Sequence, residues 1–203
     1  MIRLVRDEKP EVGLAFLAMA YGTKPLADGT PFDFDELYGK VYAPTVGECG
    51  MTAQRADRLF ESADGVLEAV WRSLQRAEVV IVDCTTRSAD VALELGLAIA
   101  LGKRIIVLAQ HLDDIPTDLR GRVRPILYQG AGLGVAALMR HLKEHLQIIR
   151  HETITENDLL PLKSSGTEPI SATIVLVAKN RMVIETDDRG HRRLWELSSA
   201  DTA

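Results

Sequence analysis

Short apolar runs alternate along the chain with segments in which apolar residues recur every three or four positions. Continuous runs bounded by turn formers are typical of strands buried on both faces of a parallel sheet. The recurrent spacing is typical of helices that pack one face against a sheet. The pattern predicts strands at Leu14–Ala20, Glu78–Asp83 and Arg104–Ala109, and helices at about Ser62–Arg76, Ala89–Leu101 and Gly134–Ile149.

Weaker signals fill the intervals between these elements. The segment from Gly22 to Pro31 is rich in turn formers and predicts a loop long enough to close over a ligand. Asp33–Tyr38, with acids in its first turn, predicts a short helix, and Val41–Pro44 predicts a short second strand. Ile126–Tyr128 is a further short apolar run.

The alternation of strands and helices predicts a doubly wound α/β domain with a mainly parallel, flavodoxin- or Rossmann-like sheet over residues 1–150. Such sheets bind ligands beyond the carboxyl ends of their strands, where the winding reverses. That rule directs attention to Met19–Gly22, Asp83–Asp90 and Ala109–Asp114.

The chain changes character after about residue 150. Residues 151–169 are polar and predict a linker, and residues 170–203 predict a small antiparallel β-meander with turns at Lys179-Asn180 and Asp187–Gly190. Three short strands seldom stand alone, so we expect the meander to pack on the main domain or on another subunit.

Composition narrows the function classes. With 24 Lys and Arg against 29 Asp and Glu, the net charge of -5 argues against binding a nucleic acid polymer. No apolar run approaches the roughly 20 residues that span a bilayer, and the N-terminus lacks a signal-peptide pattern. Neither cysteine belongs to a Cys-x-x-Cys pair. We therefore expect a cytoplasmic protein with reduced thiols and no membrane partner.

Three carboxylates lie at the end of the clearest predicted strand, Glu78–Asp83, and in the helix after it. Asp83 ends it, and Asp90 and Glu94 project from one face of the next helix because they are four residues apart. Asp90 suits a helix start. Glu94 lies in an otherwise apolar stretch, where burying a carboxylate is costly. It therefore either faces solvent as an ordinary surface glutamate or is held for use.

This region resembles the nucleoside 2-deoxyribosyltransferase superfamily. The resemblance rests on the strand ending in Asp83, followed by Asp-Val-x-x-Glu-Leu-Gly-x-Ala-x-Ala-x-Gly-Lys over Asp90–Lys103. It extends to four further blocks, so that it covers roughly two-thirds of the chain. These blocks are Phe16–Tyr21, Arg55-Ala56-Asp57, Arg104–Leu108 and Asp113–Arg120.

The resemblance implies an enzyme that cleaves or transfers the N-glycosidic bond of a small-molecule nucleoside or nucleotide. Glu94 would be the nucleophile at C1′, and Asp83 would orient the sugar or help to protonate the leaving base. It also implies a homo-oligomer that needs no metal or organic cofactor. The residues it places around the substrate are Met19, Tyr21, Gly22, Arg55, Asp57 and Asp90, with Arg55 suited to a phosphate.

The chain departs from the family pattern at two positions. Met19-Ala20-Tyr21 stands where the family often has Met-Pro-Phe, and Leu93 stands where an aromatic often precedes the glutamate. Two alternatives stay open: a Toll/interleukin-receptor-like NAD hydrolase, which also uses a glutamate after the third strand, and a non-catalytic nucleotide-sensing or assembly module. Asp83 could equally cap a turn, and Arg55 and Asp57 could be an exposed ion pair.

Overall fold

A computed structural model of the 203-residue chain describes residues 6–56, 66–129, 133–151, 172–178, 181–188 and 191–198. The chain divides into two compact units, Met1–Glu152 and Thr153–Ala203. The first unit holds the α/β sheet and the second holds the meander, and each is described by itself.

The first unit is built on a five-stranded sheet in which every neighbouring pair is parallel. Its order is β4 (Thr52–Arg55), β1 (Leu14–Ala18), β5 (Val79–Asp83), β6 (Arg104–Ala109) and β7 (Ile126–Leu127). Numbered by chain position within this sheet, the order is 2-1-3-4-5, which is that of doubly wound flavodoxin-like folds. The predicted α/β fold class is confirmed.

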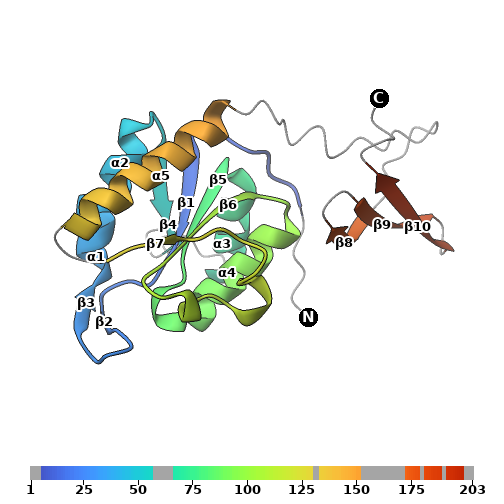
Figure 1. Ribbon diagram of the computed structural model, residues 1–203. Helices are drawn as coiled ribbons and strands as arrows, with labels where there is room; N and C mark the ends of the chain where they lie inside the picture. Colours follow the sequence, from blue (N-terminus) through green and yellow to red (C-terminus); the bar gives the residue numbers. More distant parts are fainter. Residues whose placement is uncertain are drawn as a thin grey trace. The chain divides into compact units, whose positions relative to one another are not determined.

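Helices cover both faces of this sheet (Figure 1). α3 (Val66–Arg76) and α4 (Ala89–Ala100) cover one face, and α5 (Leu133–His151) covers the other together with the helical segment that follows β3. Alternate residues of β5 feed the two cores: Val80 and Val82 pack towards α4, whereas Val79 and Ile81 pack towards α5. This alternation determines on which side of the sheet each later residue of the strand lies.

The expected strand at Val41–Pro44 is wrong. α1 (Phe34–Leu37), a π-helical turn η1 (Tyr38–Tyr42) and α2 (Ala43–Glu48) instead form one continuous helical segment. Pro44 has no N–H to donate to the carbonyl four residues earlier, and the amide of Ala43 donates to Tyr38 five residues back. The apolar spacing across the whole segment is helical. Its buried members are Phe34, Leu37, Tyr38, Val41, Tyr42 and Val46.

The true second strand, β4, is the less apolar segment Thr52–Arg55, which lies at the sheet edge. The turn-rich segment expected to be a loop contains a small antiparallel hairpin, β2 (Thr23–Pro25) and β3 (Pro31–Asp33). Single 3₁₀ turns follow the carboxyl ends of the central strands. They are η3 (Thr85–Arg87), η4 (Leu112–Asp114) and η5 (Thr117–Leu119).

The second unit is a three-stranded antiparallel meander, as expected. Its strands are β8 (Ala172–Ala178), β9 (Arg181–Asp188) and β10 (His191–Ser198), in the order β10-β9-β8. The β8–β9 register shifts between Ile174 and Leu176.

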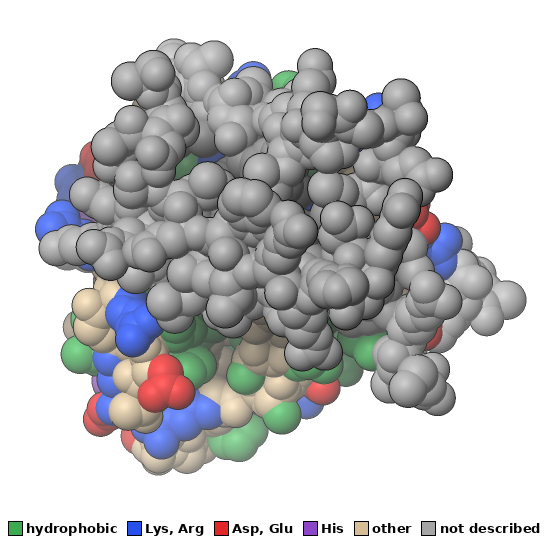
Figure 2. Space-filling model, turned by 90° about the vertical axis from the view of Figure 1, so that its right-hand side faces the viewer, with side chains coloured by type: hydrophobic (Ala, Val, Ile, Leu, Met, Phe, Trp, Pro, Cys, Tyr) green, Lys and Arg blue, Asp and Glu red, His purple; other side chains and the backbone are tan. Residues whose placement is uncertain are grey.

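Among the described residues of the whole chain, no helix combines the length and apolar character needed to cross a bilayer. On the face shown in Figure 2, described Lys or Arg side chains lie next to Asp or Glu side chains, with hydrophobic side chains between them.

Candidate active site

The site lies where the winding of the sheet reverses. β1 and β5 are neighbours whose following helical segments pack on opposite faces, so a crevice is expected beyond their carboxyl ends. A cavity of about 310 Å³ opens at this place. Its lining comes from the segments that follow β1 and β4, from β2, from the β5–α4 loop and from the first turns of α4. The lining residues are Met19, Ala20, Tyr21, Lys24, Pro25, Ala56, Thr86, Ser88, Asp90, Val91 and Glu94.

Glu94 is the buried acid of this cavity. It sits on α4 between residues that pack into the core, only 8% of its surface is exposed, and it lines the cavity. Within the part of the chain that the structure describes, its carboxylate has no hydrogen bond or ion pair. Burial, together with repulsion from Asp90, raises the pKa of Glu94 from 4.5 to about 8. A buried carboxyl group of this kind is a candidate for catalysis.

Asp90 lies one helical turn before Glu94 and also lines the cavity. Unlike Glu94 it is exposed, as the first turn of a helix allows. The two carboxylates share a face of α4 because they are four residues apart. Both acids therefore line the same cavity.

The opposite wall comes from the segment after β1. Met19 is buried, whereas the Tyr21 ring is 49% exposed and lies under the Lys24 ammonium, whose Nζ is 5.6 Å from the ring centroid. A half-exposed aromatic ring at a cavity is suited to stacking against a planar ligand. Gly22 does not line the cavity; its φ of 66° instead turns the chain into β2.

The β5–α4 loop contributes strained backbone to the cavity. Thr86 and Arg87 adopt φ values of 77° and 54°, a left-handed conformation that a β-branched residue rarely adopts. Such strain costs about 1–3 kcal/mol and occurs preferentially at functional sites. Ser88 follows as the N-cap of α4, and its side chain makes no capping hydrogen bond. Thr86 and Ser88 lie within the Asp83–Asp90 stretch that the sequence singles out, but neither was predicted individually as a site residue.

Asp83 does not line this cavity. It shares a strand face with Val79 and Ile81, and therefore points away from α4 and Glu94. Its carboxylate accepts hydrogen bonds of 2.7 Å from both the Tyr42 and the Tyr128 hydroxyl groups (Oη). The structure gives Asp83 a place in a buried network instead of contact with a sugar.

This network anchors the strained loop. The amide of Thr85 donates to Asp83 Oδ1 at 3.0 Å, and the Thr85 hydroxyl lies 3.2 Å from the Tyr128 hydroxyl. The same Thr85 hydroxyl accepts the amide of Gln110 at 3.1 Å, which ties the loop to the end of β6. Burial raises the pKa of Asp83 despite these hydrogen bonds. No sequence signal points to the two tyrosines, which are 41 and 45 residues away from Asp83.

Arg55 is likewise outside the cavity lining. Its side chain is 3% exposed, pairs with Asp35 at 2.7 Å and stacks over the Tyr38 ring at 4.6 Å. These contacts place it on the α5 side of the sheet, because Tyr38 belongs to that core. The predicted Asp57 lies outside the described residues.

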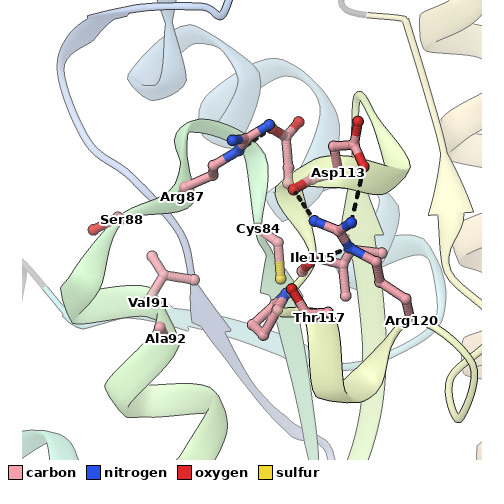
Figure 3. Close-up of a pocket in the computed structure, with 11 residues that line it drawn as sticks. Cys84, Arg87, Ser88, Val91, Ala92, Asp113, Ile115, Thr117 and Arg120 are labelled. Carbon is pink, nitrogen blue, oxygen red and sulfur yellow. Dashed lines mark hydrogen bonds and ion pairs between the residues drawn. The ribbon is translucent and has the colours of Figure 1, made fainter.

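A second cavity, of about 290 Å³, lies on the other side of the first turn of α4 (Figure 3). It shares Ser88 and Val91 with the first cavity. Arg120 turns back onto Asp113 at 2.9 Å, as Figure 3 shows, and Arg87 pairs with Asp114 at 3.3 Å. The arginines of this cavity are therefore already neutralised by neighbouring carboxylates.

The described residues contain no group of three or more His, Cys, Asp or Glu side chains arranged to hold a metal ion. Glu94, Tyr21 and Lys24 line one cavity, which offers acid–base or nucleophilic chemistry by a carboxyl group beside an aromatic ring and a lysine. No protein-family model matches this sequence, and no curated protein matches it.

Proposed function

We propose that this chain cleaves or transfers the N-glycosidic bond of a nucleoside or nucleotide, with Glu94 as the nucleophile. The observation that carries the proposal is the position of Glu94: a buried carboxyl group, without a hydrogen-bond or ion-pair partner among the described residues, that lines a cavity at the switch point of the sheet. The resemblance to the nucleoside 2-deoxyribosyltransferase superfamily supplies the reaction class.

The proposed first step forms a bond between a Glu94 oxygen and C1′ of the sugar. The C1′–N bond breaks, and the base leaves with its electron pair and takes up a proton from solvent. The transition state resembles an oxocarbenium ion, whose positive charge an adjacent carboxylate stabilises. Water then hydrolyses the glycosyl ester in a hydrolase, or a second base displaces Glu94 in a transferase. Tyr21 provides the stacking surface for the base.

The pKa of Glu94 determines the pH dependence of this reaction. A nucleophile must be ionised, and with a pKa of about 8 only a minor fraction of Glu94 is ionised at pH 7. We expect kcat/KM to rise as the pH approaches 8 and to level off above it, because kcat/KM reports ionisations of the free enzyme.

NAD is a second candidate substrate, favoured by a specific observation. Asp83, the acid expected to protonate a departing base, is absent from the residues that line the cavity. Nicotinamide leaves its positively charged ribosyl linkage as a neutral molecule and needs no proton. A site with one nucleophilic carboxylate is therefore sufficient for this leaving group.

The test is base release from a panel of nucleosides, nucleoside 5′-monophosphates and NAD. We expect Glu94→Gln and Glu94→Ala to lose at least 100-fold in turnover, as removal of a covalent nucleophile does. Glu68→Gln, at an exposed position of α3, is the matched control and should keep the rate of the unmodified chain. A nucleoside with fluorine at the 2′ position of the sugar should leave a glycosyl ester on the peptide that contains Glu94. Equal turnover in the Glu94 variants would remove Glu94 from the reaction.

A further inference from the structure

Helix α4 is apolar on the side that faces away from the sheet. Leu93 and Ile99 are 53% and 48% exposed, and the outward row Ala92, Gly96 and Ala100 lies between them. A helix that is apolar on all sides is normally buried on all sides. An exposed apolar stripe on a packed helix marks a surface that another protein covers.

Among the described residues, no contact accounts for the glycine at position 96. Gly96 lies in the middle of α4, its φ is that of an ordinary helix, and a Cβ placed there would meet no atom of the described residues within 4 Å. Glycine in a helix interior costs about 1 kcal/mol relative to alanine. The lack of a side chain is useful where another backbone approaches closely.

We propose that α4 packs antiparallel against the α4 of a second copy of this chain, about a two-fold axis that passes beside Gly96. The stripe is symmetric about this residue: alanines lie four positions before and after it, and large aliphatic residues lie three positions before and after it. A two-fold interface requires a surface complementary to itself. Helical geometry then sets each Leu93 over the partner's Ala100, and each Ile99 over the partner's Ala92.

Charge selects the antiparallel direction. Asp90 is the one ionisable residue on the exposed surface of α4 and lies six positions before Gly96. In an antiparallel pair the two Asp90 carboxylates are about 18 Å apart along the helix axes, at a rise of about 1.5 Å per residue. A parallel pair would bring them together, with both helix dipoles aligned.

A stable dimer needs a larger buried area than α4 alone offers, so the proposed interface extends beyond α4. Stable interfaces bury roughly 800 Å² on each partner, which is more than one stripe about 18 Å long provides. The rim therefore includes neighbouring α3 and the η4–η5 segment, which lies against the start of α4 across the second cavity. Because Ala92 lines the second cavity, which shares Ser88 and Val91 with the candidate site, the partner would lie near that site. The inference itself does not depend on the proposed function.

The test is the mass of the full chain in solution, measured by sedimentation across a range of concentrations. We expect the mass of two chains for the unmodified protein and of one chain for Leu93→Glu and Ile99→Glu. Ile148→Glu is the matched control, because Ile148 is 55% exposed on α5, and this variant should keep the mass of two chains.

Cross-linking gives a second measurement that does not disrupt the exposed apolar side of α4. Residues beside a two-fold axis meet their own copies, so Gly96→Cys should form a disulfide between chains on mild oxidation, whereas Ile148→Cys should not. Cys49 and Cys84 are buried and do not interfere. The mass of one chain at every concentration would overturn the proposal. So would a dimer insensitive to Leu93→Glu and Ile99→Glu, or the absence of a Gly96→Cys cross-link.

Discussion

Replacing Glu94 by glutamine should make the protein more stable, and increasingly so as the pH rises. The pKa of Glu94 is about 8 in the folded protein, against 4.5 for a free glutamate. Between these values the folded state keeps a proton that the unfolded chain releases, so raising the pH favours unfolding. The loss of stability caused by ionising the buried Glu94 is absent below pH 4.5 and complete above about pH 8. Glutamine has the same shape as the protonated acid and does not titrate.

The difference of about 3.5 between the two pKa values corresponds to about 5 kcal/mol at about 1.4 kcal/mol per pKa unit. Glu94 is 8% exposed, so solvent screening reduces this figure little. We expect Glu94→Gln to exceed the unmodified chain in free energy of unfolding by about 1 kcal/mol at pH 5 and about 5 kcal/mol at pH 9.

Urea unfolding at four or more pH values measures this difference. Glu68→Gln, an exposed substitution on α3, is the control, and its difference from the unmodified chain should stay within about 0.5 kcal/mol at every pH. A difference between Glu94→Gln and the unmodified chain that did not grow from pH 5 to pH 9 would refute the reasoning. It would mean that Glu94 ionises as freely as a surface residue and that burial does not raise the pKa of its carboxyl group.

Three further predictions concern the surroundings of the site. Asp83→Ala should lower the free energy of unfolding by about 3–5 kcal/mol, because it leaves the hydroxyl groups of Tyr42 and Tyr128 buried without their acceptor. Tyr128→Phe should lower it by only about 1–2 kcal/mol. Equal effects of the two substitutions in urea titrations would contradict the network. Thr86→Gly should raise the free energy of unfolding by about 1 kcal/mol, because glycine adopts the φ of 77° without strain. A lower free energy of unfolding in this variant would argue against backbone strain at position 86. Burial raises the pKa of Cys84 to about 12, so iodoacetamide at pH 8 should modify it only after unfolding, and rapid labelling of the folded protein would show that the thiol is accessible.

Part of the site was predictable because its signals are local. Glu94 stands out as an acid in the middle of an apolar helix, and Asp90 belongs with it because residues four apart share a helix face. Met19 and Tyr21 follow from the rule that the carboxyl ends of parallel strands surround the ligand, and both line the cavity. The error at Val41–Pro44 had a local remedy, since the apolar spacing from Phe34 to Val46 is that of a helix.

The sequence by itself determined the alternation of strands and helices, the parallel sheet, the C-terminal meander and the helix that carries Glu94, because these depend on periodicities of two and 3.6 residues. Only the tertiary structure decided where Asp83 and Arg55 point. Each ends a strand, and whether such a residue faces the cavity or the opposite core depends on strand register and on partners distant in sequence. Asp83 and Arg55 lie towards Tyr42, Tyr128 and Tyr38, whereas Glu94 lies across the sheet from them. Burying a carboxylate at a strand end costs the least free energy where buried hydroxyl groups can donate hydrogen bonds to it, and only the folded chain brings those donors together.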